Sequence, residues 1–270
     1  MHSCLAFCQE SPWRFQLSLE RLKPRKPYSK PWSNAKDLFW PGKVLPKEQW
    51  VRTRVPLGNP GVMFDWTRAF ARDAKRVLDL GCGNGYWLVH SGLARADVDH
   101  LGIELVPPAL RLGSLRAGQR GLFHVKFAWG DATEFVVERC PSNSVDEVHL
   151  YHPQPYYEAG KIARRQLTPE VLSAIQRVLR PGGQFVFQTD NPAYMIYARR
   201  IVPTLFEFHE RFEPWEDMPK GRTLREIVAR SQGLAIFRST SIALTLSDEE
   251  RAARVANLPQ PDFDANKSKR

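Results

Sequence analysis

The chain has 270 residues, of which 43% are hydrophobic and 25% are charged, and its formal net charge is +10. That length allows one α/β domain of about 200 residues with extensions at its ends. No apolar run approaches the ~20 residues that a membrane span requires, and residues 5–8 are too short for the core of a signal peptide, so we expect a cytoplasmic protein outside the membrane.

The first 60 residues are basic and rich in proline and tryptophan. They hold eleven Lys and Arg against four acids, eight of the 21 prolines and four of the eight tryptophans. This density of proline opposes regular core elements. Because cations bind phosphates and indole rings stack on bases, we expect residues 1–60 to form an arm that binds a polyanion. A solubilising tail, or residues added by a misassigned start codon, is the alternative interpretation.

Residues 77–85 read Val-Leu-Asp-Leu-Gly-Cys-Gly-Asn-Gly, and a predicted helix follows from Tyr86. A strand, a glycine turn and a helix in this order place a nucleotide-like cofactor at the carboxyl end of a parallel sheet. The dinucleotide pattern needs glycine at the position of Tyr86, which disfavours an NAD-type site. The loop resembles the first motif of class I methyltransferases, which use S-adenosylmethionine (SAM). The resemblance implies that Asp79 accepts from the ammonium group of SAM, while Gly81, Gly83 and Gly85 make room for its methionine part.

Two more acids follow the next two predicted strands. Glu104 ends the strand over residues 100–104, about twenty residues past the loop, where a carboxylate binds both ribose hydroxyls in dinucleotide folds. Asp131 follows the strand over residues 123–128 and fits an acceptor for the adenine amino group. One glycine loop is weak evidence, but a loop with two acids at successive strand ends indicates a SAM site. The alternative is an α/β sheet with glycine turns and no nucleotide.

The remaining patterns alternate between helix and strand. Thr168 and the proline after it begin a helix with one apolar face, and the Arg-Pro-Gly-Gly at residues 180–183 ends it. The sum is a Rossmann-like α/β fold of the class I methyltransferase type, with a seven-stranded, mostly parallel sheet and helices on both faces. We predict helices over 62–72 and 106–120, strands over 145–150 and 184–189, and an antiparallel pair over 206–212 and 235–246.

The predicted methyltransferase domain therefore covers residues 61–246. The segment after it, residues 247–270, balances five acids with five bases, and we expect a flexible, solvated tail. The four cysteines, Cys4, Cys8, Cys82 and Cys140, form no Cys-x-x-Cys pair, so we expect neither a structural disulfide nor a bound metal.

Four motifs lie after the fourth and fifth strands: the loop at residues 152–157, the pair Arg164-Arg165, Thr189-Asp190, and Thr223-x-x-Glu226. With them, the chain from about residue 76 to 244 resembles the tRNA (guanine-N7)-methyltransferase family. The resemblance implies methyl transfer from SAM to N7 of guanosine 46 in the tRNA variable loop. By position it implies that Asp190, Thr223 and Glu226 bind the target guanine, and that Arg164 and Arg165 grip RNA or position the loop.

The implied chemistry suits these residue types. Guanine N7 carries a lone pair and no proton, so methylation there needs no general base, and holding the base in line is the main catalytic contribution. Carboxylates complement the N1–H and N2–H donors of guanine, and a nearby negative charge favours the cationic product. We therefore take Asp190 and Gln154 as the candidate catalytic residues, although Asp190 alone also fits a helix N-cap.

The loop at residues 152–157 departs from the family, whose members have Pro-Asp-Pro-Trp there. Gln154 replaces the aspartate and Tyr156 the tryptophan, so the loop can accept a hydrogen bond but brings no charge. One alternative is therefore a catalytically impaired homologue that binds SAM and RNA. Another is a methyltransferase for a nucleobase amino group, since the loop loosely resembles an (Asn/Asp)-Pro-Pro-Tyr sequence. In each case we expect a monomer or homodimer.

Overall fold

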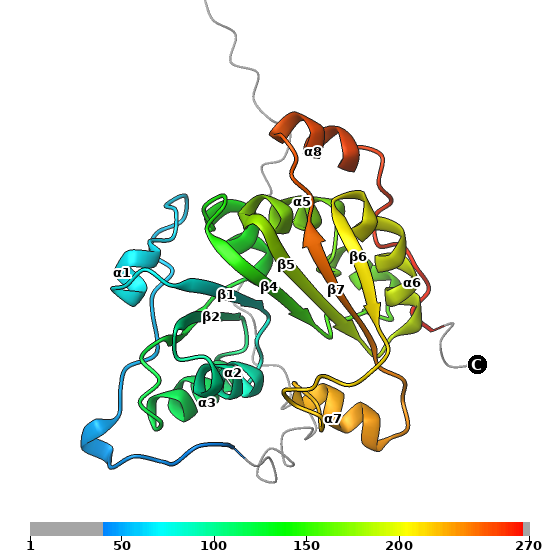
Figure 1. The fold of residues 1–270 in the computed structure, drawn as a ribbon. Coiled ribbons are helices and arrows are strands. Elements are labelled where there is room, and N and C mark those ends of the chain that lie inside the picture. Colours follow the sequence, from blue (N-terminus) through cyan, green and yellow to red (C-terminus); the bar gives the residue numbers. More distant parts are fainter. Residues whose placement is uncertain (1–39, 267–270) are drawn as a thin grey trace, which may run out of the picture. The chain divides into compact units, whose positions relative to one another are not determined.

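The computed structural model describes residues 40–266, and one seven-stranded sheet organises them (Figure 1). Its strands are β1 (Lys75–Leu80), β2 (Val98–Glu104), β3 (Val125–Trp129), β4 (Val145–Tyr151), β5 (Leu179–Thr189), β6 (Phe206–Arg211) and β7 (Phe237–Ala243). The order is β3-β2-β1-β4-β5-β7-β6, in which β1 to β5 pair in parallel and β7 runs antiparallel to both neighbours. This confirms the predicted seven-stranded Rossmann-like sheet and its final antiparallel pair.

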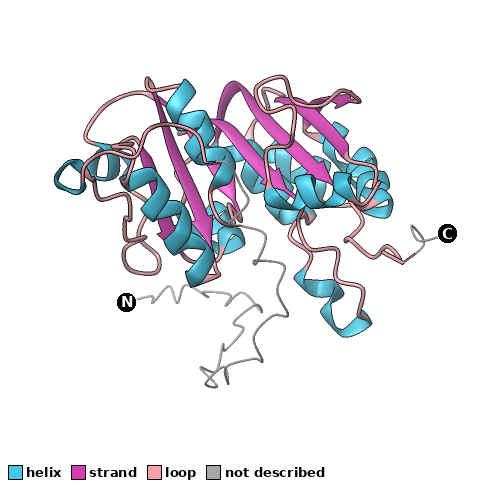
Figure 2. Cartoon of the chain, turned by 90° about the horizontal axis from the view of Figure 1, so that it is seen from below, coloured by secondary structure: helices cyan, strands magenta, loops and turns pink. Residues whose placement is uncertain are grey.

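Helices pack along the sheet (Figure 2). The α-helices are α1 (Trp66–Phe70), α2 (Tyr86–Ala94), α3 (Pro107–Gly118), α4 (Ala132–Glu134), α5 (Pro169–Val178), α6 (Pro192–Ile201), α7 (Leu224–Ser231) and α8 (Asp248–Val255). Shorter turns are the 3-10 helices η2 (Lys47–Gln49), η4 (Ala159–Arg164) and η5 (Val202–Thr204), and the π-helix η3 (Phe135–Arg139). As predicted, the side chain of Thr168 begins α5 by accepting from the Val171 N–H.

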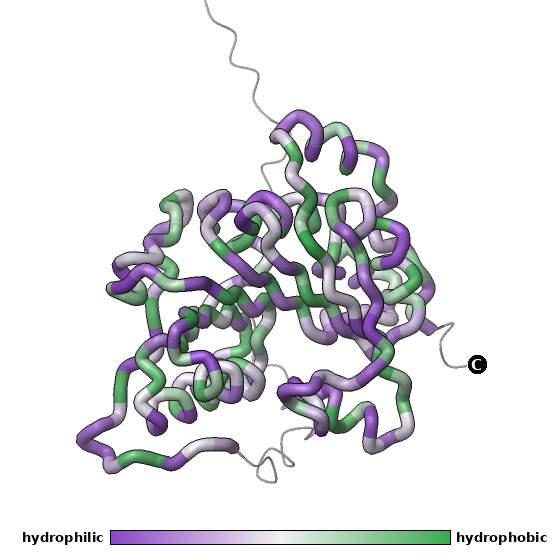
Figure 3. Tube along the Cα trace, viewed as in Figure 1, coloured by the Kyte–Doolittle hydropathy of each residue, from purple (hydrophilic) through white to green (hydrophobic). Residues whose placement is uncertain are grey.

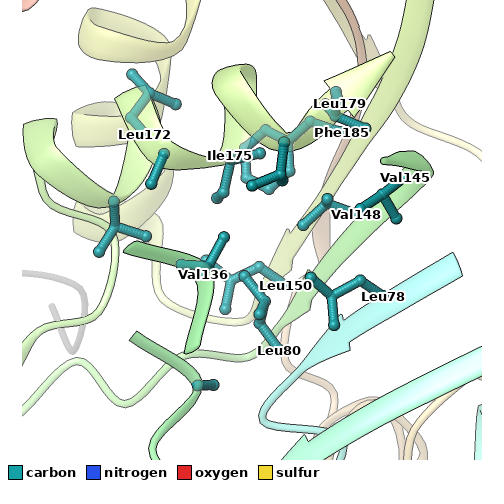
Figure 4. Close-up of a cluster of buried hydrophobic side chains, with 14 of the residues drawn as sticks. Leu78, Leu80, Val136, Val145, Val148, Leu150, Leu172, Ile175, Leu179 and Phe185 are labelled. Carbon is teal, nitrogen blue, oxygen red and sulfur yellow. The ribbon is translucent and has the colours of Figure 1, made fainter. Parts of the chain in front are cut away.

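The two sheet faces bury different side chains. Leu78 and Leu80 of β1 join a cluster with Ile175 of α5 and Phe185 of β5 (Figure 4). Because side chains alternate along a strand, Asp79 turns to the opposite face, where α2 and α3 pack on β2 and β3. The hydropathy of the chain follows this arrangement, with apolar residues concentrated in the central strands (Figure 3). Asp79 is thus a carboxylate carried on a buried strand, which matters for the site below.

The order of the strands reverses between β1 and β4, because the chain adds β2 and β3 on one side of β1 and the later strands on the other. In open α/β sheets, ligands bind in the crevice outside the carboxyl ends of the strands at such a switch point. The ends of β1, β2, β4 and β5 carry candidate site residues that were predicted from the sequence.

Two predicted elements differ most from the structure. The helix expected over residues 62–72 is limited to α1, because the Asp65 side chain caps it at the Arg68 N–H and Ala71 ends it with a φ of 56°. The strand expected from residue 184 begins at Leu179, directly after α5. Its extra residues form an irregularity against Val145 of β4, and Gly182, at a φ of 73°, supplies the turn.

Both predicted extensions are also corrected. Residues 1–39 lie outside the described part of the chain, but residues 40–60 pack on the domain: Arg54 bridges to Phe127 in parallel, and the Val55 N–H donates to the Phe127 carbonyl at 3.0 Å. The tail is not a flexible segment over residues 247–266, because α8 starts with a capping box at Ser247 and Phe263 packs against the core. No helix among residues 40–266 has the length and apolar character needed to cross a membrane.

Candidate functional site

The glycine loop joins the ends of β1 and β2. The N–H groups of Gly81 and Cys82 both donate to the Ile103 carbonyl of β2, at 2.9 and 3.0 Å. Gly81, Gly83 and Gly85 have φ values of 78°, 57° and 68°, which side chains disfavour, and a Cβ on Gly85 would clash with the ring of Phe127. All three glycines are therefore favoured by backbone geometry, and Gly85 also by close packing; that they make room for the methionine part of SAM stays a prediction.

Glu104 braces this loop from the end of β2. One carboxylate oxygen accepts from the Gly83 N–H at 2.8 Å and the other from the Val106 N–H at 2.7 Å, at the start of α3. A carboxylate offers about four lone-pair positions, so each oxygen retains capacity for a hydroxyl donor. The geometry fits the expected binding of ribose hydroxyls.

Asp79 is the group in this region whose charge is least satisfied. It is buried, and its Oδ1 atom has no hydrogen-bond partner among the described residues. Burial, and secondarily the charge of Glu104, raise the pKa of Asp79 from 3.8 to about 8. A buried carboxylate oxygen without a donor is costly unless a ligand pairs with it. The ammonium group of SAM is a donor of the right charge, so the residues present fit this cofactor.

Asp131 lies farther along the same edge, where its Oδ1 atom accepts from the Thr133 and Glu134 N–H groups and begins α4. Its acceptance of the adenine amino group stays a prediction. The sequence reasoning missed two apolar neighbours, Trp129 and Leu105, which are 59% and 57% exposed and are joined by a hydrogen bond of 3.1 Å from the indole to the Leu105 carbonyl. Large exposed apolar residues at strand ends are the signal that could have identified this surface.

The ends of β4 and β5 are linked by a pair that sequence reasoning did not predict. His152 Nδ1 lies 3.0 Å from Asp190 Oδ1, and the second oxygen of Asp190 accepts from Arg225. Burial by itself raises the pKa of Asp190, but the hydrogen bonds from His152 and Arg225 outweigh it and lower the pKa to about 2. Asp190 is therefore ionised at neutral pH. The N-cap of α6 is its neighbour Asn191, so the helix-cap alternative for Asp190 is wrong.

Gln188 determines which nitrogen of His152 carries the proton. The Gln188 Nε2 atom lies 2.8 Å from His152 Nε2 and 3.0 Å from Glu226 Oε2, while its Oε1 accepts from the indole of Trp215 at 2.5 Å. The amide therefore donates both hydrogens, and His152 Nε2 accepts. The remaining nitrogen, Nδ1, carries its hydrogen toward Asp190, which orients that carboxylate.

Glu226 lies behind this network and not on the surface. It is fully buried and accepts from the Gln188 amide, from the Arg222 N–H at 2.8 Å, and from Arg238 at 2.5 Å. The Thr223 side chain accepts from the Glu226 N–H at 3.0 Å and caps α7. Glu226 is thus held inside this network, and the Thr223 hydroxyl serves as a helix cap; binding of the target guanine by these two residues stays a prediction.

The two arginines after β4 differ in environment. Arg165 is buried, and its guanidinium donates to the carbonyls of Pro155 and Tyr156 at 2.6 and 3.0 Å, which favours the second of its two predicted roles, positioning the loop, over gripping RNA. Arg164 is exposed at the end of η4 and Gln154 is exposed in the loop, so both stay candidates for substrate contact.

The loop at residues 152–157 carries backbone strain. His152 and Tyr156 have φ values of 49° and 42°, a region that non-glycine residues rarely occupy. Each such residue costs about 1–3 kcal/mol and persists only where its surroundings hold it. Contacts from Asp190, Gln188 and Arg165 hold this loop in place.

A column of polar side chains on β4 is a further feature that the sequence reasoning missed. Glu147, His149 and Tyr151 alternate on one face and are linked by hydrogen bonds of 3.0 and 2.8 Å. Arg222 donates to the Tyr151 hydroxyl at 2.9 Å, and its guanidinium lies 3.9 Å from the ring centroid of Trp215. These contacts hold Arg222, in the segment before α7, against Tyr151 at the end of β4. The alternation of polar residues along the strand was the available signal.

The buried pair between Glu226 and Arg238 gives a prediction on stability. Replacing Arg238 with methionine leaves a buried carboxylate without its cation, and we expect the free energy of unfolding to fall by about 3–5 kcal/mol. Urea denaturation of the purified variant measures this. The double variant Arg238→Met with Glu226→Met should regain part of the loss, since no charge is then left unpaired. A single variant within 1 kcal/mol of the unmodified protein would contradict the prediction.

Comparison with known proteins agrees with this geometry. The model of a family described as "Putative methyltransferase" matches residues 73–237. The curated tRNA (guanine-N(7)-)-methyltransferase of Nitrosococcus oceani is 28% identical over 70% of this chain and 79% of its own length. That of Alcanivorax borkumensis is 31% identical over 69% of this chain and 73% of its own length. The match to the same enzyme of Paenarthrobacter aurescens, 29% identical, spans 60% of this chain and about half, 54%, of that relative.

A solved structure supports the fold independently. The 16S rRNA methyltransferase KamB is similar with a TM-score of 0.51 and 16% identity, over 67% of this chain and 93% of its own. Identity at that level speaks for the architecture alone. Together, the sheet order, the glycine loop with its acids, and the matched family model and relatives show that the chain belongs to the tRNA (guanine-N7)-methyltransferase family.

Proposed function

We propose that this protein transfers the methyl group of SAM to N7 of a guanine in tRNA, and that the target is guanosine 46 of the variable loop. The observation that carries the proposal is the order β2-β1-β4-β5. It brings the cofactor candidates Asp79 and Glu104 to the same edge of the sheet as the ionised Asp190. The relatives named above carry this activity in their names. We further propose a cytoplasmic protein that acts as a monomer or homodimer.

Three acids would hold the cofactor. Asp79 would pair with the ammonium group and Glu104 with the ribose hydroxyls, while Asp131 would accept from the adenine amino group. When bound, SAM supplies a methyl group on a positively charged sulfur. The buried Asp79 is the residue whose electrostatics change most on binding, because it gains the donor that it lacks among the described residues.

Asp190 would orient the base. Its carboxylate accepts from N–H donors, and guanine presents N1–H and N2–H on the edge away from N7. Since His152 fixes the carboxylate and no proton has to leave N7, rate enhancement comes from positioning and from a negative charge near the developing cation. Arg164, exposed at the end of η4, is available to contact phosphate.

One assay tests the function. The purified protein is incubated with methyl-labelled SAM and unmodified tRNA, and the product is treated with aniline, which cleaves the chain at N7-methylguanosine. Label with cleavage at position 46 is the expected result. Label without cleavage would indicate transfer to another group of a base. Tight tRNA binding without label would indicate the impaired SAM- and RNA-binding homologue, the second candidate, which the uncharged Gln154 favours.

Gln154 itself offers a gain-of-function test. Replacing it with aspartate restores a negative charge at the exposed tip of the loop, and we expect kcat to rise by about three- to tenfold, since a charge near the developing cation contributes roughly 1 kcal/mol. The isosteric Gln154→Glu, whose carboxylate reaches farther, is the comparison. Steady-state methylation of tRNA measures both. A fall in kcat for Gln154→Asp would show that the amide takes part directly.

The basic arm gives a prediction on tRNA affinity. Deleting residues 1–38, which leaves the packed segment from residue 40 intact, removes seven Lys and Arg and should weaken tRNA binding. The slope of log K against log salt should flatten with the loss of phosphate contacts. Filter binding between 50 and 200 mM salt measures it. An unchanged slope would assign the arm to the alternative of a solubilising tail.

A further inference from the structure

We propose, building on the function proposed above, that residues 259–265 form a strap that positions both substrate-facing segments of the site. These segments are the loop at residues 152–157 after β4 and the junction of β5 with α6 at Asp190-Asn191. The strap then contributes to the rate of tRNA methylation and not to the binding of SAM. Arg165 is its central positioning residue.

Arg165 joins the strap to the loop. Its Nε and Nη2 atoms donate to the carbonyls of Pro155 and Tyr156, at 2.6 and 3.0 Å. Its Nη1 atom donates to the carbonyls of Pro261 and Phe263, at 2.6 and 2.7 Å. The buried guanidinium therefore bridges two chain segments about a hundred residues apart, and it does so through backbone carbonyls in all four contacts.

Phe263, in the strap, packs its ring on the Arg165 guanidinium. Its ring centroid lies 3.8 Å from the Arg165 guanidinium carbon, and 4.9 and 5.6 Å from the rings of Tyr194 and Tyr197 on α6. A guanidinium that stacks on an aromatic ring is held in one plane, which fixes the direction of its donors. The aromatic contacts therefore determine where Arg165 holds the Tyr156 carbonyl.

A second contact joins the strap to Asn191, the neighbour of Asp190. The Asn191 side chain caps α6: its oxygen accepts a hydrogen bond from the Tyr194 N–H at 3.0 Å. The nitrogen of the same amide donates to the Ala265 carbonyl at 3.1 Å. The Tyr197 hydroxyl donates to the Pro259 carbonyl at 2.9 Å, farther back on the strap. The strap thus contacts both segments that bring His152 and Asp190 together.

Strain explains why such a strap is needed. The positive φ of Tyr156 is a conformation that the loop leaves when its neighbours release it. The Arg165 clamp acts on the carbonyl of that same residue. Since His152 lies in the same loop, a relaxed loop would also shift the hydrogen bond that orients Asp190. Glu104, in contrast, accepts from the Gly83 and Val106 N–H groups, and Asp79 lies opposite Gly102 of β2 and His149 of β4, so none of these contacts involves the strap.

Two pairs of variants test the strap, one pair in the full-length protein and one with the C-terminus shortened. Phe263→Ala removes the stacked ring, whereas Phe263→Tyr keeps it. Deletion of residues 259–270 removes the strap, whereas deletion of residues 267–270 spares it. We expect the first member of each pair to lower kcat by about ten- to a hundredfold, since small misplacement of a catalytic group has effects of that size. The KM for tRNA and the Kd for SAM should change by less than about threefold, and the second members should match the unmodified protein.

Hydrogen exchange gives a readout that does not depend on methylation. In the ligand-free protein, peptides covering residues 154–158 should exchange faster in Phe263→Ala than in Phe263→Tyr, while peptides of β1 and β2 stay unchanged. If the unmodified protein methylates no tRNA, the proposed function fails, and exchange alone still decides on the strap. Unchanged exchange at residues 154–158, or an equal loss of SAM affinity, would overturn the strap as a positioning element.

Discussion

Replacing Asp190 with asparagine should lower kcat for tRNA methylation by about a hundred- to a thousandfold, the effect of removing one preorganised electrostatic contact. The variant keeps the size of the side chain but loses the charge that, in the proposed function, faces the base and the developing cation. It also leaves Arg225 without its anionic partner. Single-turnover methylation with saturating tRNA measures the loss of the chemical step.

The binding of SAM separates a substrate role from a cofactor role for this residue. We expect the Kd for SAM, measured by calorimetry, to stay within about twofold in Asp190→Asn, because the cofactor candidates lie at the ends of β1, β2 and β3. Asp73→Asn, whose carboxylate is 95% exposed, is the matched control for the loss of one negative charge. Equal losses of SAM affinity and kcat in Asp190→Asn would place this residue in the cofactor site instead.

The pH dependence of the Asp190 variant follows from its low pKa. A group with a pKa of about 2 is fully ionised between pH 6 and pH 9. The ratio of kcat between the unmodified protein and Asp190→Asn should therefore be constant across that range. A ratio that falls toward 1 below pH 7 would mean that the carboxyl titrates there and that its partners hold it less firmly than the structure shows.

Replacing Asp79 with asparagine should weaken SAM binding by about ten- to a hundredfold, since a hydrogen bond to a charged group contributes roughly 1.5–3 kcal/mol. The unmodified protein should also bind SAM more tightly as the pH rises. Its free carboxyl has a pKa of about 8, pairing with an ammonium needs the ionised form, and binding therefore releases a proton. Affinity should increase from pH 6 toward pH 8 and fall at higher pH, where the ammonium group of SAM loses its own proton.

Calorimetry in two buffers of different ionisation enthalpy measures both the affinity and the released proton. The Asp79→Asn variant has no titrating group at this position, so its affinity should not rise between pH 6 and pH 8. A flat profile for the unmodified protein would show that Asp79 is already ionised before SAM binds, and that the ligand-free site supplies a donor for it.

The same substitution should stabilise the ligand-free protein. The folded state raises the pKa of Asp79 above 3.8, so the residue destabilises the fold once the pH exceeds 3.8, increasingly up to about pH 8 and constantly above. Asp79→Asn removes this cost, and the free energy of unfolding should rise by a few kcal/mol at pH 8 but little at pH 4. Urea denaturation at the two pH values is the measurement. A less stable variant at pH 8 would contradict the expected sign.

The glycine loop, its acids and the sheet were predictable because their signals are local. A glycine with positive φ, a carboxylate at the end of an apolar run, and a hydroxyl before a helix act over a few residues. Asp79, Glu104 and the three glycines therefore lie at the edge where the pattern placed them. The antiparallel pair of β6 and β7 also lies where the sequence predicted it.

Only the tertiary structure decided which charged residues face outward. Arg164 and Arg165 are adjacent and alike in sequence, yet one is exposed and the other is buried, because the acceptors of Arg165 come from the loop and from a segment about a hundred residues later. Glu226 is buried for the same reason, since its cation, Arg238, lies on β7. Contacts between residues so far apart in sequence leave no local pattern. For this reason the composition of the C-terminal tail predicted a solvated segment, although the tail supplies the strap.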